Sequence, residues 1–180
     1  LITLATELEG HPDNIAAAFY GGATIAWIEK SVGADGVSSA VGKAVSLKVD
    51  DRIKALLLIP DNQLATAKAR KLLPETIPHQ DAVLNSSRSA LLVHALAERP
   101  DLLFTATEDL LHQNYRESAM PKTIALVEKL RGAGLAAVVS GAGPSVMVLY
   151  SNSEDEIDQV AALAPGFNAL KLEIAKTGAQ

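Results

Sequence analysis

The sequence predicts an α+β fold with two layers, in which helices cover one face of a mainly antiparallel sheet. After Asp51 the hydrophobic patterns follow the order strand, helices, two strands, helix, strand, which is the order of a ferredoxin-like unit. Hydrophobic residues make up 48% of the 180 residues and charged residues 21%, as in folded globular proteins. This length is enough to bury one sizeable core or two small ones.

The first fifty residues contain a smaller set of elements. An alanine-rich run after Asp13 and Asn14 predicts a short helix with a polar N-cap, and the pair Gly21-Gly22 ends it. Strands are predicted where β-branched and aromatic residues gather or where apolar and polar residues alternate. The predicted elements are a helix over 15–20, a strand over 23–29, a loop or ragged hairpin tip over 32–42 and a strand over 45–49.

An acidic break at Asp50 and Asp51 marks the predicted domain boundary, which separates residues 1–50 from residues 51–180. Beyond it, continuous apolar runs predict buried strands, and apolar residues at helical spacing predict helices. The predicted elements are a strand over 53–59, helices over 66–73, 81–98 and 107–113, a helix from Pro121 to Gly132, strands over 135–139 and 146–150, a helix over 155–163 and a strand over 170–174.

Charge and composition exclude several classes of protein. Sixteen basic and 21 acidic residues give a net charge of -5 without a basic block, so nucleic acid and anionic membranes are not expected partners. The absence of cysteine excludes disulfides, thiolate metal sites and cysteine nucleophiles. No apolar run approaches the length of a membrane span, and we expect a cytoplasmic protein.

A glycine-rich loop, Ser140-Gly141-Ala142-Gly143-Pro144-Ser145, lies between two predicted strands. Glycines permit positive φ and the close approach of another group, and successive backbone N–H groups can hold an anion. The same residues also suit a tight strand connection in which the glycines only satisfy the turn geometry. The loop is therefore a candidate anion site whose alternative is a simple turn.

Polar residues crowd the segment before the first predicted helix, at Glu7, Glu9, His11, Asp13 and Asn14. Carboxylates there could hold a divalent cation, and the asparagine amide could orient a hydroxyl. An ordinary capping segment with exposed charges is the alternative. A zinc site is not favoured, because the segment lacks a second nitrogen or sulfur ligand at motif spacing.

Two further segments could bind a carboxylate. Thr66 and Arg70 lie four positions apart on one face of a predicted helix, and a guanidinium binds a carboxylate through two hydrogen bonds. Arg116 ends the polar run 112–116. For both arginines the alternative is an exposed position with a salt bridge. Neither a Walker loop nor a dinucleotide fingerprint occurs in the sequence.

In their order and spacing these segments resemble the homoserine kinase family of the GHMP kinase superfamily. The resemblance rests on the segments 9–14, 21–22, 66–70, 112–116 and 140–145 and covers essentially the whole chain. It implies the end of a ribosomal-protein-S5-like N-terminal domain over 1–50 and a ferredoxin-like GHMP kinase C-terminal domain over 51–180. It also implies phosphorylation of the L-homoserine hydroxyl by ATP with Mg²⁺, within threonine biosynthesis, and suggests a homodimer.

The resemblance implies a role for each matching residue. Asn14 would hold the substrate hydroxyl with His11 beside it, and no residue is assigned as a catalytic base. Glu7 would bind magnesium, with Glu9 as the other candidate. The remaining implied site residues are Thr66, Arg70 and Arg116 for the substrate carboxylate, Gly141 and Gly143 near the substrate, and Ser140, Gly141, Ala142 and Gly143 near the ATP phosphates.

One expected part of the superfamily does not occur in the sequence. The resemblance implies a phosphate loop of the type P-x-x-x-G-L-G-S-S-A, and no such stretch is found in these 180 residues, which begin with Leu1. We expect that loop upstream, in a longer protein, and we expect the chain alone to bind ATP weakly. The alternatives are another GHMP kinase of mevalonate type and a non-catalytic module for ligand binding or dimerisation.

Overall fold

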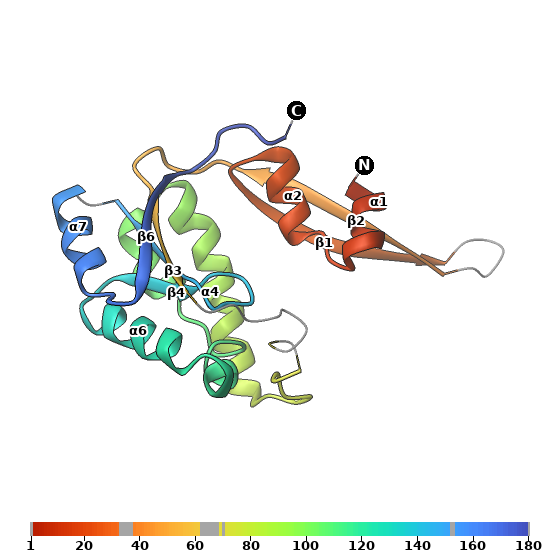
Figure 1. Cartoon of the computed structure of the whole chain (residues 1–180). Coiled ribbons are helices and arrows are strands. Elements are labelled where there is room, and N and C mark those ends of the chain that lie inside the picture. Colours follow the sequence, from red (N-terminus) through yellow and green to blue (C-terminus); the bar gives the residue numbers. More distant parts are fainter. Residues whose placement is uncertain (1, 33–37, 62–68, 70, 152–153, 180) are drawn as a thin grey trace. The chain divides into compact units, whose positions relative to one another are not determined.

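The computed structural model describes residues 2–32, 38–61, 69, 71–151 and 154–179 (Figure 1). By its internal contacts the chain divides into two compact units, which are taken one at a time below. The first contains residues 1–49 and 174–180, and the second contains residues 50–173. Residues 174–180, which the sequence analysis assigned to the second domain, thus cluster with the first unit.

The first unit is an antiparallel hairpin with two short helices against it (Figure 1). The strands β1 (Ala23–Val32) and β2 (Ser38–Leu47) place Ile25 opposite Val45. Both strands are longer than predicted, and β2 occupies residues 38–42, where a loop was expected. Each residue of that segment has a cross-strand partner in β1.

Two helices complete this unit, α1 (Ile2–Glu9) and α2 (Asp13–Tyr20). The helix α1 was not predicted from the sequence pattern. The predicted polar N-cap of α2 is wrong, because the helix begins at Asp13 and Pro12 takes the cap position without a side-chain hydrogen bond. The predicted glycine end is confirmed, since Gly21 adopts a φ of 72° and donates its N–H to the Ala17 carbonyl.

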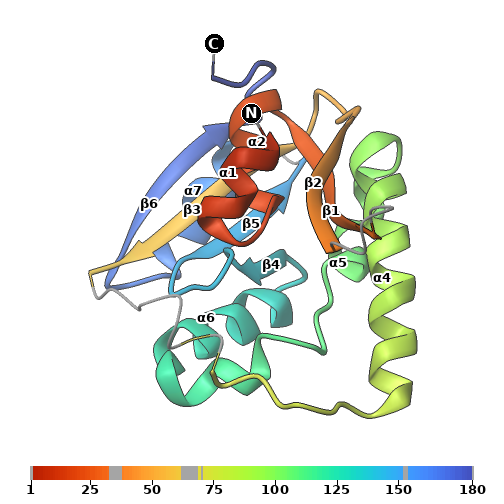
Figure 2. The ribbon, with the colours of Figure 1, turned by 90° about the vertical axis from the view of Figure 1, so that its right-hand side faces the viewer.

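The second unit is built on a four-stranded sheet in the order β4-β5-β3-β6, with every neighbouring pair antiparallel (Figure 2). Strand β5 lies between the parallel strands β3 and β4, and β3 lies between the parallel strands β5 and β6. These are the two interlocked split β-α-β units of the predicted arrangement. The strands are β3 (Lys54–Pro60), β4 (Ala136–Val139), β5 (Val146–Tyr150) and β6 (Phe167–Glu173).

The predicted helices over 81–98, 121–132 and 155–163 are confirmed, whereas the one over 107–113 is wrong. Residues 107–113 are irregular and lie between two short helices. Half of the helix predicted over 66–73 lies outside the described residues, and the described residues 71–73 form a turn and a bend and not a helix. The helical segments are α4 (His79–Ala97), η1 (Pro100–Leu102), α5 (Leu103–Ala106), η2 (Asn114–Ala119), α6 (Pro121–Gly132) and α7 (Glu154–Ala162).

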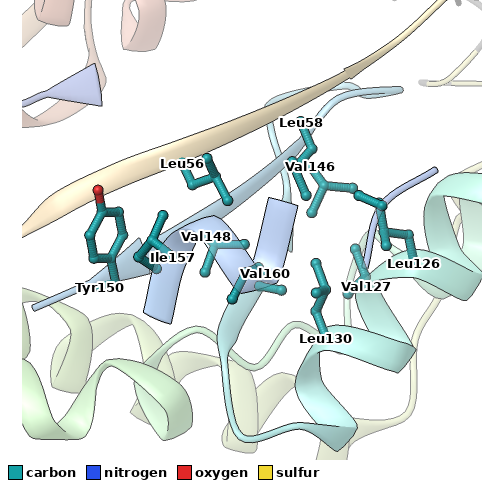
Figure 3. Close-up of a cluster of buried hydrophobic side chains, with 12 residues drawn as sticks. Leu56, Leu58, Leu126, Val127, Leu130, Val146, Val148, Tyr150, Ile157 and Val160 are labelled. Carbon is teal, nitrogen blue, oxygen red and sulfur yellow. The ribbon is translucent and has the colours of Figure 1, made fainter. Parts of the chain in front are cut away.

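The core of the second unit is mainly aliphatic and lies between one face of the sheet and the helices α6 and α7 (Figure 3). Alternate residues of β3 and β5, among them Leu56 and Val148, point into it and are fully buried. Leu130 of α6 and Ile157 of α7 close it from the helical side. This packing fixes the end of β4 and the start of β5, and therefore both ends of the loop that joins them.

Replacing Leu56 with Ala should lower the free energy of unfolding by about 2–5 kcal/mol, because it leaves a cavity in a close-packed core. Leu170→Ala in β6 is the matched control, since Leu170 is 41% exposed and loses less buried area. Urea denaturation of both variants measures the difference. Equal losses would contradict this description of the core.

Candidate functional site

The glycine-rich loop is a tight connection between β4 and β5. The Ser140 N–H donates to the Ser145 carbonyl at 2.8 Å, and the Gly143 N–H donates to the Ser140 carbonyl at 3.0 Å. Gly141 and Gly143 have φ angles of 58° and 86°, the region that favours glycine. No partner for the N–H groups of Gly141 and Ala142 lies among the described residues. The loop therefore combines a turn geometry with backbone donors that suit an anion.

The two glycines differ in their surroundings. A Cβ on Gly143 would lie 2.5 Å from the Met120 Sδ and 3.1 Å from the Val139 Cγ1, whereas a Cβ on Gly141 would meet nothing within 4 Å. Gly143 therefore packs against a buried side chain, and Gly141 faces open space. The Thr123 Oγ1 donates to the Pro144 carbonyl at 2.8 Å and holds the loop from the side of α6.

Arg116 links the loop to η2. Its side chain is buried, and Nη1 donates to the Gly141 carbonyl at 3.0 Å. Nε is also buried, and it has no hydrogen-bond partner in the part of the chain that the structure describes. A buried guanidinium N–H without an acceptor is costly. A buried guanidinium therefore lies beside the glycine loop, and it is a group that binds carboxylates and phosphates.

Asp109 explains why residues 107–113 do not form the predicted helix. Its carboxylate accepts the N–H groups of Leu111, His112 and Gln113 at 2.7 to 3.1 Å, so these donors bond to a side chain instead of to carbonyls one turn earlier. Burial alone would raise the pKa of Asp109. The hydrogen bonds from the His112 ring and from these N–H groups outweigh that effect and hold its pKa below the usual value.

The structure brings together some of the predicted site residues. Arg116 lies directly beside the loop 140–143. Glu7, His11 and Asn14 lie in the first unit, at the end of α1, between the helices and in the first turn of α2, and all three are exposed. Thr66 and Arg70 fall outside the described residues. Their assigned roles stay predictions.

Within the described residues there is no group of three or more His, Asp or Glu side chains that could hold a metal ion. Mg²⁺ is commonly bound through one or two carboxylates together with substrate phosphates, so a single residue such as Glu7 remains compatible with that role.

Across the described helices, none is long and apolar enough to cross a membrane.

Several residues that shape the site were not singled out from the sequence. They are three buried side chains that contact the glycine loop or the end of β4, and a carboxylate that accepts backbone N–H groups of the segment before η2. Gln113 belongs to a polar run that the sequence did mark, but Met120 looks like an ordinary core residue. The residues concerned are Asp109, Gln113, Met120 and Thr123.

Comparison with known proteins identifies the class of the second unit. Residues 87–164, which include η2, α6 and the glycine loop, match the family of the GHMP kinases C terminal. The chain therefore carries a GHMP kinase C-terminal domain. This agrees with the predicted superfamily and with the α+β architecture.

Among curated proteins, several that match the chain bear the name homoserine kinase. The chain is 49% identical to the homoserine kinase of Streptomyces coelicolor, and the match covers 91% of the chain and 50% of that relative. It is 46% identical to that of Mycobacterium tuberculosis over 97% of the chain and 54% of the relative. The chain thus spans about half the length of the curated relatives it matches.

Solved structures share the fold. The homoserine kinase of Cytophaga hutchinsonii matches 91% of this chain and 52% of its own chain, with a TM-score of 0.70 at 20% identity. Mevalonate kinase from L. major, solved in complex with R-mevalonate, matches 82% of this chain and 49% of its own, with a TM-score of 0.51 at 14% identity. At these identities the likeness concerns the fold alone.

Gly143→Ala should destabilise the protein by more than Gly141→Ala does. Both substitutions place alanine at a positive φ, which costs about 1–2 kcal/mol, but only Gly143 lacks room for the added methyl group. Urea unfolding of the two variants compares the costs directly. A larger loss for Gly141→Ala would contradict the packing against Met120.

Asp109 should make stability depend on pH in the acid range. Because its folded pKa is lowered, its contribution is present above the unfolded value of about 4 and is lost as the pH falls through the folded pKa. Asp109→Asn keeps one oxygen acceptor and does not titrate. The variant should be less stable at neutral pH and should lose less stability than wild type between neutral and acid pH. Urea denaturation across that range tests this, and identical slopes would contradict it.

Proposed function

We propose that this chain supplies part of the substrate site of a homoserine kinase, which transfers a phosphoryl group from ATP to the L-homoserine hydroxyl and forms O-phospho-L-homoserine. The observation that carries the proposal is the buried Arg116 guanidinium beside the glycine loop, with Nη1 on the Gly141 carbonyl and Nε without a described acceptor. Relatives at 46–49% identity that bear the name homoserine kinase support the same assignment.

Arg116 has the chemistry to bind the α-carboxylate of the substrate. A guanidinium offers several N–H donors in a fixed planar fork, and its pairing with a carboxylate is strong where water is excluded. Arg116 is buried, so its charge needs an anionic or strongly polar partner. We assign Arg70 and Thr66 to the same carboxylate.

The remaining assignments follow the side-chain chemistry. Asn14 and His11 would orient the homoserine hydroxyl, which needs a hydrogen-bond partner but no strong base. The loop from Ser140 to Gly143 would lie near the phosphates, since backbone N–H groups bind anions. ATP supplies the phosphoryl group, and Mg²⁺, which Glu7 would help to hold, offsets the phosphate charge.

The assignment favours homoserine over mevalonate. The likeness to mevalonate kinase is at 14% identity and concerns the fold alone, whereas the curated relatives bear the name homoserine kinase. Because the chain spans about half of those relatives, turnover by the 180 residues alone is not expected. We propose a cytoplasmic enzyme of threonine biosynthesis, with a homodimer as its suggested assembly.

Isothermal titration of the purified chain tests the substrate assignment. L-homoserine should bind, and Arg116→Gln should weaken that binding at least about tenfold, because a buried hydrogen bond to a charged group is lost. Arg99→Gln is the control, since this arginine is exposed and pairs with Asp101. MgATP should bind weakly or not at all.

Three results would contradict the proposal. Binding of mevalonate in preference to L-homoserine would reassign the substrate. Equal affinities in wild type and Arg116→Gln would remove Arg116 from the site. Micromolar affinity for MgATP would overturn the expectation that the chain alone binds ATP weakly or not at all.

A further inference from the structure

The glycine loop begins at an edge of the sheet, where the backbone needs a partner from outside the strands. Among the described residues, β4 is an edge strand, paired on one side only, with β5. The Ser140 N–H points toward β5 and donates to the Ser145 carbonyl. Because successive N–H groups of a strand point in opposite directions, the Val139 N–H points to the open edge.

The side chain of Gln113 satisfies this N–H. Its Oε1 accepts the Val139 N–H at 2.6 Å, and Gln113 is only 8% exposed. The bond therefore lies in a site with little water to replace it, where an unpaired N–H is costly. It fixes the last residue of β4, immediately before the glycine loop.

The backbone of Gln113 is held at the same time. Its N–H donates to the Asp109 carboxylate at 2.7 Å, and its carbonyl accepts the Arg116 N–H at 3.0 Å. Three groups of one residue are thus bonded to Asp109, Arg116 and Val139, of which only Val139 is distant in the sequence. The result is a direct connection from the end of β4 to the turn that carries Arg116.

We propose that Gln113 is a positioning residue that fixes Arg116 and the glycine loop relative to each other. Arg116 donates to the Gly141 carbonyl, two residues beyond Val139, so the two segments are joined at both Val139 and Gly141. If the bond to Val139 is lost, the Arg116 bond alone holds this side of the loop. The part of the inference that concerns homoserine rests on the proposed function.

Two variants of similar size separate the hydrogen bond from the bulk of the side chain. Gln113→Glu keeps an oxygen acceptor at the same reach, whereas Gln113→Met has a similar length and lacks that acceptor. In Gln113→Met, hydrogen exchange of the Val139 and Gly143 amides should accelerate about tenfold, and Gln113→Glu should restore protection. L-homoserine affinity should fall about tenfold in the first variant and recover in the second.

Leu130→Val is the stability control. Leu130 lies in the hydrophobic core, and its side chain makes no hydrogen bond to the glycine loop or to η2. It should lower stability without changing L-homoserine affinity. Unchanged amide exchange in Gln113→Met, or equal effects of Gln113→Met and Leu130→Val on affinity, would overturn the proposal. If wild type binds no L-homoserine, the proposed function fails and the amide exchange still decides the role of Gln113. Gln113→Asn, whose amide is one methylene short, replaces Gln113→Met if that variant does not fold.

Discussion

The buried charge of Arg116 is the constraint on which the arrangement around the glycine loop depends. A guanidinium is buried in a protein only with strong acceptors, and Arg116 reaches one in the Gly141 carbonyl. The segment 107–113 is irregular because the Asp109 carboxylate accepts three of its N–H groups, and η2, which carries Arg116, follows directly. The irregular segment 107–113 and η2 are therefore joined to the glycine loop by hydrogen bonds from both Gln113 and Arg116.

The glycine loop is packed against α6 on one side, and its other side has free space at Gly141. Met120 and Thr123 support it on the side of α6, so Gly143 has no room for a side chain. Gly141 faces open space, and its carbonyl is held while its N–H is left without a described partner. Support on one side and exposed donors on the other are the properties that an anion-binding loop needs.

The match to the GHMP kinases covers residues 87–164, and these contain both the irregular segment 107–113 and the glycine loop. The predicted roles of Glu7, His11 and Asn14 belong to the other unit, where the side chains are exposed and arranged around the junction of two short helices. Because the relatives are about twice as long as the chain, activity is a property proposed for the whole protein. Binding measurements on the chain address its own share of the site.

The superfamily was inferred from the resemblance of several segments to a known family. The sequence alone determined the order of the strands along the chain, the helices α4, α6 and α7, and the glycine loop. These depend on local patterns: apolar runs, helical spacing and glycine positions. Only the tertiary structure decided that residues 107–113 are irregular, that residues 38–42 pair in a strand, and that Gln113 bonds to Val139. The partners in these cases come from distant segments or compete with local helix formation, and no local pattern records which of them prevails.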